Sequence, residues 1–224
     1  MKIGIIGGGG VAQVFGAGLI ALGHDVVLGI REVTPQELAK ERSNAQPLAD
    51  WQAKTGAGIV TMAQAAAHGE LVVNATAGQA SLQALALAGA ENLRGKILID
   101  IANALDFSMG MPPFLNPAYT GPTSLGEQIQ AAFPDTHVVK AFNTIAAAVM
   151  VNPGLVPGAH DLFIAGNDAG AKATVSDLAR ALGWQHITDL GDIVGARASE
   201  ALLPIWLRVW TTTGSPLHNL HLAH

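Results

Sequence analysis

The sequence has no cysteine and few charged side chains. Without a cysteine among its 224 residues, the chain cannot form a disulfide, a thiolate zinc site or a cysteine nucleophile. Asp, Glu, Lys and Arg make up only 13% of the residues, and the net charge is -5. Nucleic-acid-binding proteins usually cluster Lys and Arg, and the sequence shows no such cluster. We therefore expect no nucleic-acid partner, and chemistry that does not depend on thiols.

Charge is also missing from the hydrophobic run that opens the chain. Residues 3–23 include no charged side chain, which is typical of a signal peptide or a membrane helix. The many glycines of this run, and Gln13 at its middle, disfavour a continuous spanning helix. A strand, a tight turn and a helix explain them better, so we expect a cytoplasmic protein with no membrane partner.

Four consecutive glycines lie at the centre of this run. They follow an apolar strand at residues 2–6 and precede an apolar helix at 11–22. With the alanine two positions later, they fit the dinucleotide motif G-x-G-x-x-G/A, whose second glycine lets a pyrophosphate approach the backbone. Phosphate contacts are therefore predicted for Gly7, Gly8, Gly9, Gly10, Val11 and Ala12. A tight turn without a ligand is the alternative.

The second strand, residues 26–29, runs into Ile30, Arg31 and Glu32. In dinucleotide-binding folds this strand end lies beside the adenine ribose, where Asp or Glu binds the 2′-hydroxyl of NAD and Arg accommodates the 2′-phosphate of NADP. Arg31 therefore favours NADP. The alternatives are NAD binding through Glu32 and a role of Arg31 as an ordinary surface charge.

Strands and helices alternate along the rest of the chain, which predicts an α/β fold with a doubly wound parallel sheet. We expect further strands at residues 59–61, 71–76, 97–101, 137–144, 161–166 and 185–191. We expect helices at residues 35–55, 63–68, 124–133, 168–182 and 196–210, and one more after Gly78. The loop 106–124 is rich in Pro, Gly, Phe and Met, and we expect it to cover either a flat ligand or a sheet edge.

Ligands of such sheets bind at the carboxyl ends of the strands. Thr76 and Ala77 end or follow one strand, and Asn103 follows another, so they are candidates to contact a cofactor's ribose and nicotinamide. Asp100 lies within an apolar strand, and we expect it to be structural. The sequence shows no convincing catalytic triad or dyad, so no catalytic residue is assigned.

Several separated motifs together resemble one family. Residues 7–12 look like a G-S-G-x-F-A turn, and residues 26–31 are similar to V-V-V-G-S-R. Residues 139–143 resemble V-K-G-F-N, residues 189–191 match D-L-G, and residues 196–200 match A-R-x-x-E. The chain thus resembles the coenzyme F420-dependent NADP oxidoreductases and the related reductase domain of the STEAP metalloreductases.

The resemblance implies a Rossmann domain at residues 1–145 that carries NADPH. Residues 146–224 would complete the sheet and form a small C-terminal helical lobe. It also implies hydride transfer between NADP(H) and a small-molecule acceptor, a deazaflavin (F420) or a flavin, which depends on proximity more than on an acid or base. By position, Arg31 would bind the 2′-phosphate and residues 8–12 the pyrophosphate. The nicotinamide side would be formed by Thr76, Ala77, Asn103 and Ala141, and Asn143 would also contact the cofactor.

Two positions depart from the family pattern. Ile30 replaces a serine whose hydroxyl would reach the 2′-phosphate, so strict selection of NADP over NAD is left open. Asn143 and Thr144 stand where the F420-dependent branch has His-Thr, so the identity of the acceptor is left open as well.

Two other functions fit the same fold. A non-catalytic redox sensor would bind NADPH without turning it over. A dehydrogenase of small carbonyl or hydroxy compounds would need an acid near the nicotinamide, for which Lys140 is the only nearby candidate.

The last residues raise three further questions, which concern a metal site, the packing of the last helix and a homodimer. His218, His221 and His224 are three apart, but no carboxylate accompanies them in the sequence, so no metal site is predicted. Arg197 and Glu200 are expected to fix the last helix to the sheet. Apolar side chains of that helix predict a homodimer interface at Leu202, Leu203, Ile205, Trp206 and Trp210.

Overall fold

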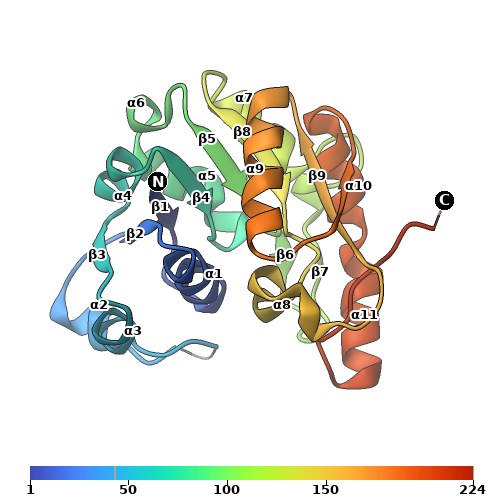
Figure 1. The fold of residues 1–224 in the computed structure, drawn as a ribbon, viewed down its shortest axis with the longest axis horizontal. Coiled ribbons are helices and arrows are strands. Elements are labelled where there is room, and N and C mark those ends of the chain that lie inside the picture. Colours follow the sequence, from blue (N-terminus) through green and yellow to red (C-terminus); the bar gives the residue numbers. More distant parts are fainter. Residues whose placement is uncertain (43, 224) are drawn as a thin grey trace.

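The computed structural model describes residues 1–42 and 44–223, which form a central sheet of eight strands in the order β10-β9-β8-β5-β4-β1-β2-β3 (Figure 1). These strands are β1 (Lys2–Ile6), β2 (Asp25–Ile30), β3 (Gly58–Thr61), β4 (Leu71–Asn74), β5 (Ile97–Asp100), β8 (His137–Ala141), β9 (Asp161–Gly166) and β10 (His186–Asp189). A separate small hairpin pairs β6 (Leu105–Asp106) with β7 (Phe114–Leu115).

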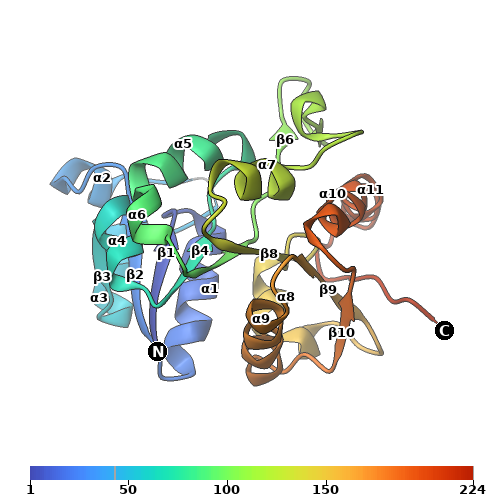
Figure 2. The same cartoon turned by 90° about the horizontal axis from the view of Figure 1, so that it is seen from above.

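Helices cover both faces of the sheet (Figure 2). They are α1 (Gly10–Ala21), α2 (Pro35–Ala39), α3 (Leu48–Thr55), α4 (Met62–His68), α5 (Gly78–Ala88), α6 (Ala90–Leu93), α7 (Leu125–Ala132), α8 (Ala147–Val151), α9 (Ala169–Ala181), α10 (Ala196–Ala201) and α11 (Leu203–Thr213). Short 3₁₀ turns lie at Pro117–Tyr119, Pro153–Leu155 and Ile193–Gly195. None of the helices in the described residues has the length and apolar character that crossing a membrane requires.

The direction of winding reverses between β1 and β4. From β1, parallel pairing runs through β2 to β3 on one side and through β4 and β5 to β8 on the other. In such sheets a crevice opens beyond the carboxyl ends of the two strands where the connections diverge. The doubly wound α/β fold is therefore confirmed, and the glycine run after β1 lies at this crevice.

Successive side chains of the strands enter two hydrophobic layers. Ile3 and Ile5 of β1 pack on the side of α1, α3, α8 and α9, whereas Ile6 packs on the side of α4, α5, α7 and α10. Strands buried on both faces need apolar residues at nearly every position, which explains their continuous hydrophobic sequence. The sheet is thus a rigid base for the turns at its carboxyl edge.

One pairing in the sheet departs from the predicted parallel arrangement. β9 runs antiparallel to β8, and β10 then runs parallel to β9. A parallel crossover needs a connection that carries the chain back along the sheet. Between β8 and β9 the only α-helix in the described chain is α8, whose five residues rise about 7–8 Å. The carboxyl ends of β9 and β10 therefore lie at the edge of the sheet opposite the glycine turn.

The single helix predicted at residues 35–55 is also wrong. α2 ends at Ala39, Lys40 is extended, and α3 begins after Pro47. The segment between them is held against α1, because the Gln13 side chain donates to the Gln46 carbonyl oxygen at 2.9 Å. The break thus brings residues 44–47 over the start of α1.

The helix predicted at residues 196–210 is interrupted at Leu202. Pro204 lies in the first turn of α11, where its ring and missing N–H prevent continuation of the preceding helix. The C-terminal helical region itself is present, with α10 and α11 at one end of the molecule (Figure 2). The division at residue 145 stays a prediction, because β8 and β9 belong to one sheet.

The loop predicted at residues 106–124 contains regular structure. It includes β7 and a 3₁₀ turn, and the β6–β7 hairpin projects from the body of the molecule beside α10 and α11 (Figure 2). Leu105 and Leu115 of this hairpin pack against Leu203, Trp206 and Leu207 of α11. The C-terminal helices therefore stabilise the segment that follows β5.

Candidate functional site

The turn from β1 into α1 leaves its outer face open. Gly7 has a φ of 132°, and a Cβ there would lie 2.6 Å from the Ala75 carbonyl oxygen. A Cβ at Gly9 would meet no atom within 4 Å. Gly7 is thus required by the turn, whereas Gly9 leaves space in which a ligand can approach the backbone.

The first amides of α1 face this space. Within the described chain no side chain caps the helix at Gly9, and its first turn has no acidic residue. Thr61 and Asp168, by contrast, cap α4 and α9 with side-chain oxygens. Gln13 stabilises the turn by donating to the Gly8 carbonyl oxygen at 3.1 Å. An uncapped helix start suits a phosphate, because its N–H groups and dipole attract anions.

A cavity of about 280 Å³ lies at the end of β2, lined by Ile30, Arg31, Glu32, Glu37 and Lys40. Arg31 is exposed and has no hydrogen-bond or ion-pair partner among residues 1–42 and 44–223. Lys40 lies on the same cavity, with its ammonium 3.1 Å from Glu37 Oε1. A 2′-phosphate at this position would meet a free guanidinium and a second cation.

The segment after β4 lies beside the glycine turn. Ala75 donates its backbone N–H to the Ile6 carbonyl oxygen at 2.9 Å, which joins this segment to β1. The Thr76 hydroxyl donates to Asn74 Oδ1 at 2.7 Å and lies 2.8 Å from Ser81 Oγ. Ala77 is exposed at the start of α5, which has no side-chain cap in the described residues. The Gly78 amide, the first of α5, donates to the Asn103 carbonyl oxygen at 3.0 Å, which joins this helix start to the turn after β5.

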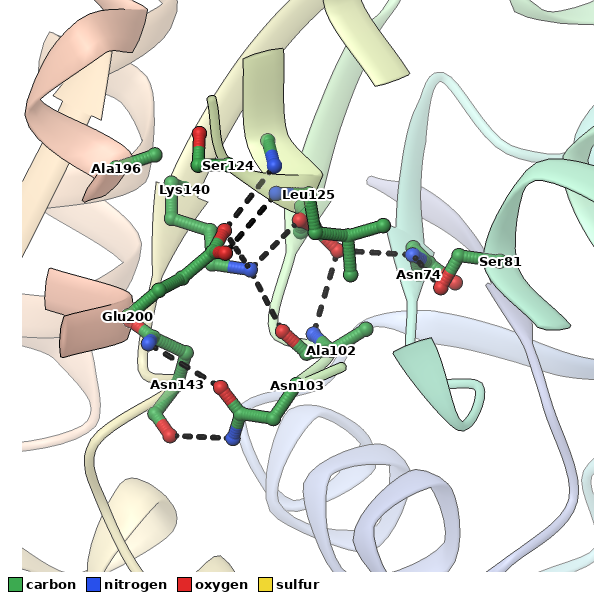
Figure 3. Close-up of polar contacts among 12 residues, drawn as sticks. Asn74, Ser81, Ala102, Asn103, Ser124, Leu125, Lys140, Asn143, Ala196 and Glu200 are labelled. Carbon is green, nitrogen blue, oxygen red and sulfur yellow. Dashed lines mark hydrogen bonds and ion pairs between the residues drawn. The ribbon is translucent and has the colours of Figure 1, made fainter. Parts of the chain in front are cut away.

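Asn103 and Asn143 join the ends of β5 and β8 (Figure 3). Asn103 Nδ2 donates to the Asn143 carbonyl oxygen at 2.7 Å, and Asn143 Nδ2 donates to Asn103 Oδ1 at 3.3 Å. Asn143 is only 3% exposed, and its Oδ1 has no partner in the part of the chain described. Since a buried unpaired carbonyl costs free energy, a ligand N–H at this position would be stabilising.

The backbone before Asn143 is strained. Phe142 has a φ of 62°, which is uncommon for a residue other than glycine and is frequent at functional turns. Its buried ring packs edge-on against Phe15 of α1, with the ring centroids 5.1 Å apart. Ala141 is fully buried at the end of β8, so it supports this turn from the core.

A buried ionic network lies behind these turns (Figure 3). Lys140 Nζ donates to Asp100 Oδ2 at 2.9 Å and to the Ala102 carbonyl oxygen at 2.6 Å, and it lies 3.0 Å from Glu200 Oε1. Burial lowers the pKa of Lys140, but the attraction of Asp100 and Glu200 outweighs burial and raises the pKa above its ordinary value. Lys140 therefore stays charged.

Both carboxylates also have partners other than Lys140. Asp100 Oδ1 accepts from Asn74 Nδ2 at 2.8 Å, as expected for a structural aspartate. The Glu200 oxygens accept from the amides of Leu125 at 2.9 Å and Gly126 at 3.1 Å, at the start of α7. The network therefore links β4, β5, β8, α7 and α10.

A larger cavity, of about 450 Å³, lies between the segment after β5 and the C-terminal helices. Its walls are mostly apolar, with hydroxyl and charged groups among them: Ala104, Leu115, Tyr119, Thr120, Gly121, Thr123, Arg197, Ala198, Glu200, Ala201 and Leu203. Ala104 directly follows Asn103, so the cavity begins beside the nicotinamide candidates. Arg197 Nε donates to Glu127 Oε2 at 2.7 Å, and this hydrogen bond lowers the pKa of Glu127.

Other motifs lie away from this edge. The Asp189 carboxylate binds Lys172 at 2.8 Å at the opposite end of the sheet, so the D-L-G motif has a structural role. His221 Nδ1 lies 2.8 Å from Asp161 Oδ2, so a carboxylate does accompany the C-terminal histidines. His224 lies outside the described residues, and residues 1–42 and 44–223 include no group of three potential ligands that could hold a metal.

The structure brings most of the predicted site residues to one edge. The glycine turn, Thr76, Ala77, Asn103 and Asn143 follow β1, β4, β5 and β8, which are neighbours in the sheet. Sequence reasoning missed Lys40, which α2 separates from Arg31, and it missed that Lys140 and Glu200 meet. The A-R-x-x-E motif was the one sequence feature that drew attention to Glu200, and it did not indicate that Glu200 contacts Lys140.

The chain is similar to several known oxidoreductases. The model of the family described as "NADP oxidoreductase coenzyme F420-dependent" matches residues 2–104. The F420-dependent NADP reductase of Methanocaldococcus jannaschii is 29% identical over 208 residues, which cover 92% of this chain and 90% of that protein. The metalloreductase STEAP3 of Rattus norvegicus is 32% identical over 92% of this chain, but the chain spans only 38% of its length.

Solved structures agree with these similarities. A crystal structure from Arthrobacter sp. FB24, provisionally assigned as an F420-dependent NADP reductase, is 47% identical, covers both chains completely and has a TM-score of 0.93. An imine reductase from Bacillus cereus shares the fold at 16% identity, with a TM-score of 0.62 over 97% of this chain and 63% of its own.

Proposed function

The chain belongs to the coenzyme F420-dependent NADP oxidoreductase family, and we propose that it passes a hydride between NADP(H) and a deazaflavin or flavin-type acceptor. As a member of this family it is an NADP-dependent oxidoreductase. The observation that supports the proposal most strongly is the uncapped start of α1 beside the free guanidinium of Arg31. These groups complement a pyrophosphate and a 2′-phosphate.

Three features of the structure fit NADPH. The α1 amides suit the pyrophosphate, and Arg31 with Lys40 suits the 2′-phosphate. The unpaired Oδ1 of Asn143 suits the N–H of the nicotinamide carboxamide. When bound, NADPH would supply a hydride to the acceptor and become NADP⁺. A proton from water would complete the reduction of the acceptor.

The chain itself would bind, orient and shield the reacting groups. The paired amides of Asn103 and Asn143 fix the two turns that face the nicotinamide. Neighbouring apolar walls exclude water, and holding the reacting atoms in contact is the main contribution a protein makes to such a transfer.

The cavity that begins at Ala104 is the place we propose for the acceptor. At about 450 Å³ it has the size of a small-molecule site. Its alanines and leucines suit the faces of a flat ring system, while the hydroxyls of Tyr119, Thr120 and Thr123 suit polar ring edges. A deazaflavin or flavin has both properties.

The structure disfavours one alternative. A carbonyl dehydrogenase would need Lys140 as its acid, but Lys140 is 1% exposed and its ammonium already contacts Asp100, Glu200 and the Ala102 carbonyl oxygen. A redox sensor that binds NADPH without turnover remains the second candidate, because it needs the same cofactor groups.

Turnover tests the proposal. Under anaerobic conditions, NADPH oxidation by the purified protein should be followed with F420, FMN or FAD as acceptor. We expect stoichiometric loss of NADPH and reduction of at least one of the three. Binding of NADPH with no oxidation by any of them would favour the sensor.

A further inference from the structure

One ammonium group joins the two regions of the site. Lys140 Nζ contacts Asp100 and the Ala102 carbonyl oxygen, which belong to the end of β5 and the turn that carries Asn103. The same atom contacts Glu200 on α10, a lining residue of the acceptor cavity (Figure 3). Lys140 itself has no place on that cavity's surface, since it is 1% exposed.

The other contacts of this network stay within their own regions. Asn74 and the Ala102 amide bind Asp100 on the cofactor side, at 2.8 and 3.2 Å. The start of α7 binds Glu200 on the acceptor side. Removing the ammonium would therefore leave each carboxylate held on its own side but would break the link between them.

We propose that Lys140 is a positioning residue that sets the spacing between the nicotinamide-facing turn 101–104 and the acceptor-lining helix α10. Its kinetic consequence depends on the proposed function, because the two sites must hold NADPH and the acceptor in contact. Misplacement by about 1 Å can slow a reaction about 100-fold, so a link of this kind affects the rate far more than cofactor affinity.

The test compares wild type with Lys140→Met, which keeps an unbranched side chain one atom shorter and removes its charge. We expect single-turnover hydride transfer to slow about 100-fold, while the NADPH dissociation constant stays unchanged, because Lys140 contacts neither the α1 turn nor Arg31. Lys172→Met is the matched control. It removes an ammonium that binds Asp189 and the Gly191 carbonyl oxygen at the far edge, and it should leave the rate unchanged.

The pH profile separates positioning from general loss of structure. Lys140 faces Asp100 from β5 and Glu200 from α10, and the Glu127–Arg197 pair of α7 and α10 lies beside them. Without Lys140, the two carboxylates face each other with no cation between them, and a proton on one of them relieves their repulsion, so the Lys140→Met rate should rise as the pH falls. The wild-type network should add no such dependence, because Lys140 stays charged.

Several outcomes would overturn the proposal. These are a Lys140→Met rate equal to wild type, a rate that falls in proportion to NADPH affinity, and a slowed rate that does not change with pH. If Lys140→Met does not fold, Glu200→Gln replaces it in the rate and affinity measurements and should also slow transfer at unchanged NADPH affinity. If wild type reduces no acceptor, the proposed function fails, and the fluorescence lifetime of bound NADPH decides. A shorter lifetime in Lys140→Met supports positioning, and an unchanged lifetime contradicts it.

Discussion

The glycine turn and the Lys140 network lie at the same edge of the sheet but are built in opposite ways. The turn presents backbone N–H groups, has no charged side chain and leaves open space at Gly9. The network consists of charged side chains that are almost completely buried and paired with one another. Ligand binding is thus assigned to an exposed backbone, and alignment to a buried set of charges.

Because of this contrast, substitutions in the two regions should separate cofactor binding from alignment of the cofactor with the acceptor. A change in the turn should alter cofactor affinity, and a change in the network should alter stability and the rate of transfer. The following experiments test that separation, beginning with the largest expected effect.

Lys140→Met should reduce the free energy of unfolding by about 3–5 kcal/mol, because removing one partner of a buried ion pair leaves uncompensated charge. Lys172→Met should cost only about 0–1 kcal/mol, since its partner Asp189 has a side chain that is 51% exposed. Urea unfolding of both variants measures the difference. Equal losses of unfolding free energy in the two variants would show that the buried network stabilises the protein no more than the exposed pair does.

Gly7→Ala should destabilise the protein by about 1–3 kcal/mol through its positive φ alone. The close approach to the Ala75 carbonyl oxygen should add to this cost. Gly9→Ala is the matched control, because its Cβ meets no atom within 4 Å. Gly9→Ala should keep wild-type stability and weaken NADPH binding, measured by unfolding and by titration. A stability loss at Gly9 as large as at Gly7 would contradict the separate roles.

Arg31→Ala should weaken NADPH binding by about 1–3 kcal/mol, the range for hydrogen bonds to charged groups, and should barely affect NADH. Titration of both cofactors gives the result. Lys40→Ala should act in the same direction with a smaller effect, because Lys40 already binds Glu37. Equal losses for NADPH and NADH in Arg31→Ala would refute the 2′-phosphate assignment.

The smallest expected effect is on the stability of the protein at acid pH. The hydrogen bond from Arg197 holds the pKa of Glu127 below its ordinary value of 4.5 in the folded state. Its stabilisation is therefore complete above that value and is lost as pH falls through the lowered folded pKa. Thermal unfolding of wild type and Glu127→Gln should differ near neutral pH and converge in acid. A difference that stays constant or grows in acid would contradict this pairing.

The sequence predicted what depends on local pattern. Each strand of the main sheet was placed within a few residues, because parallel strands buried on both faces are continuous apolar runs. The glycine motif indicated the turn after β1, because the motif consists of residues that are neighbours in the sequence. The helix predicted at residues 124–133 is also present as α7, and the Ser124 hydroxyl caps it by accepting from the Glu127 amide at 3.2 Å.

What the sequence did not predict depends on distant contacts. The segment between α2 and α3 is held by the hydrogen bond from the Gln13 side chain to the Gln46 carbonyl oxygen. β9 runs antiparallel to β8 after a connection whose helix α8 has only five residues. The Lys140–Glu200 contact joins a strand to a helix that lies 60 residues later in the chain. The spacing of residues along the sequence gives no sign of such a pair. The homodimer and the identity of the acceptor stay predictions.

A structure determined with NADPH would show where the nucleotide binds. We expect the paired phosphates to lie against the backbone amides at Gly9, Gly10 and Val11, with the 2′-phosphate at Arg31 and the carboxamide at Asn143. Phosphates bound at another edge of the sheet, or an empty glycine turn at saturating NADPH, would contradict this placement.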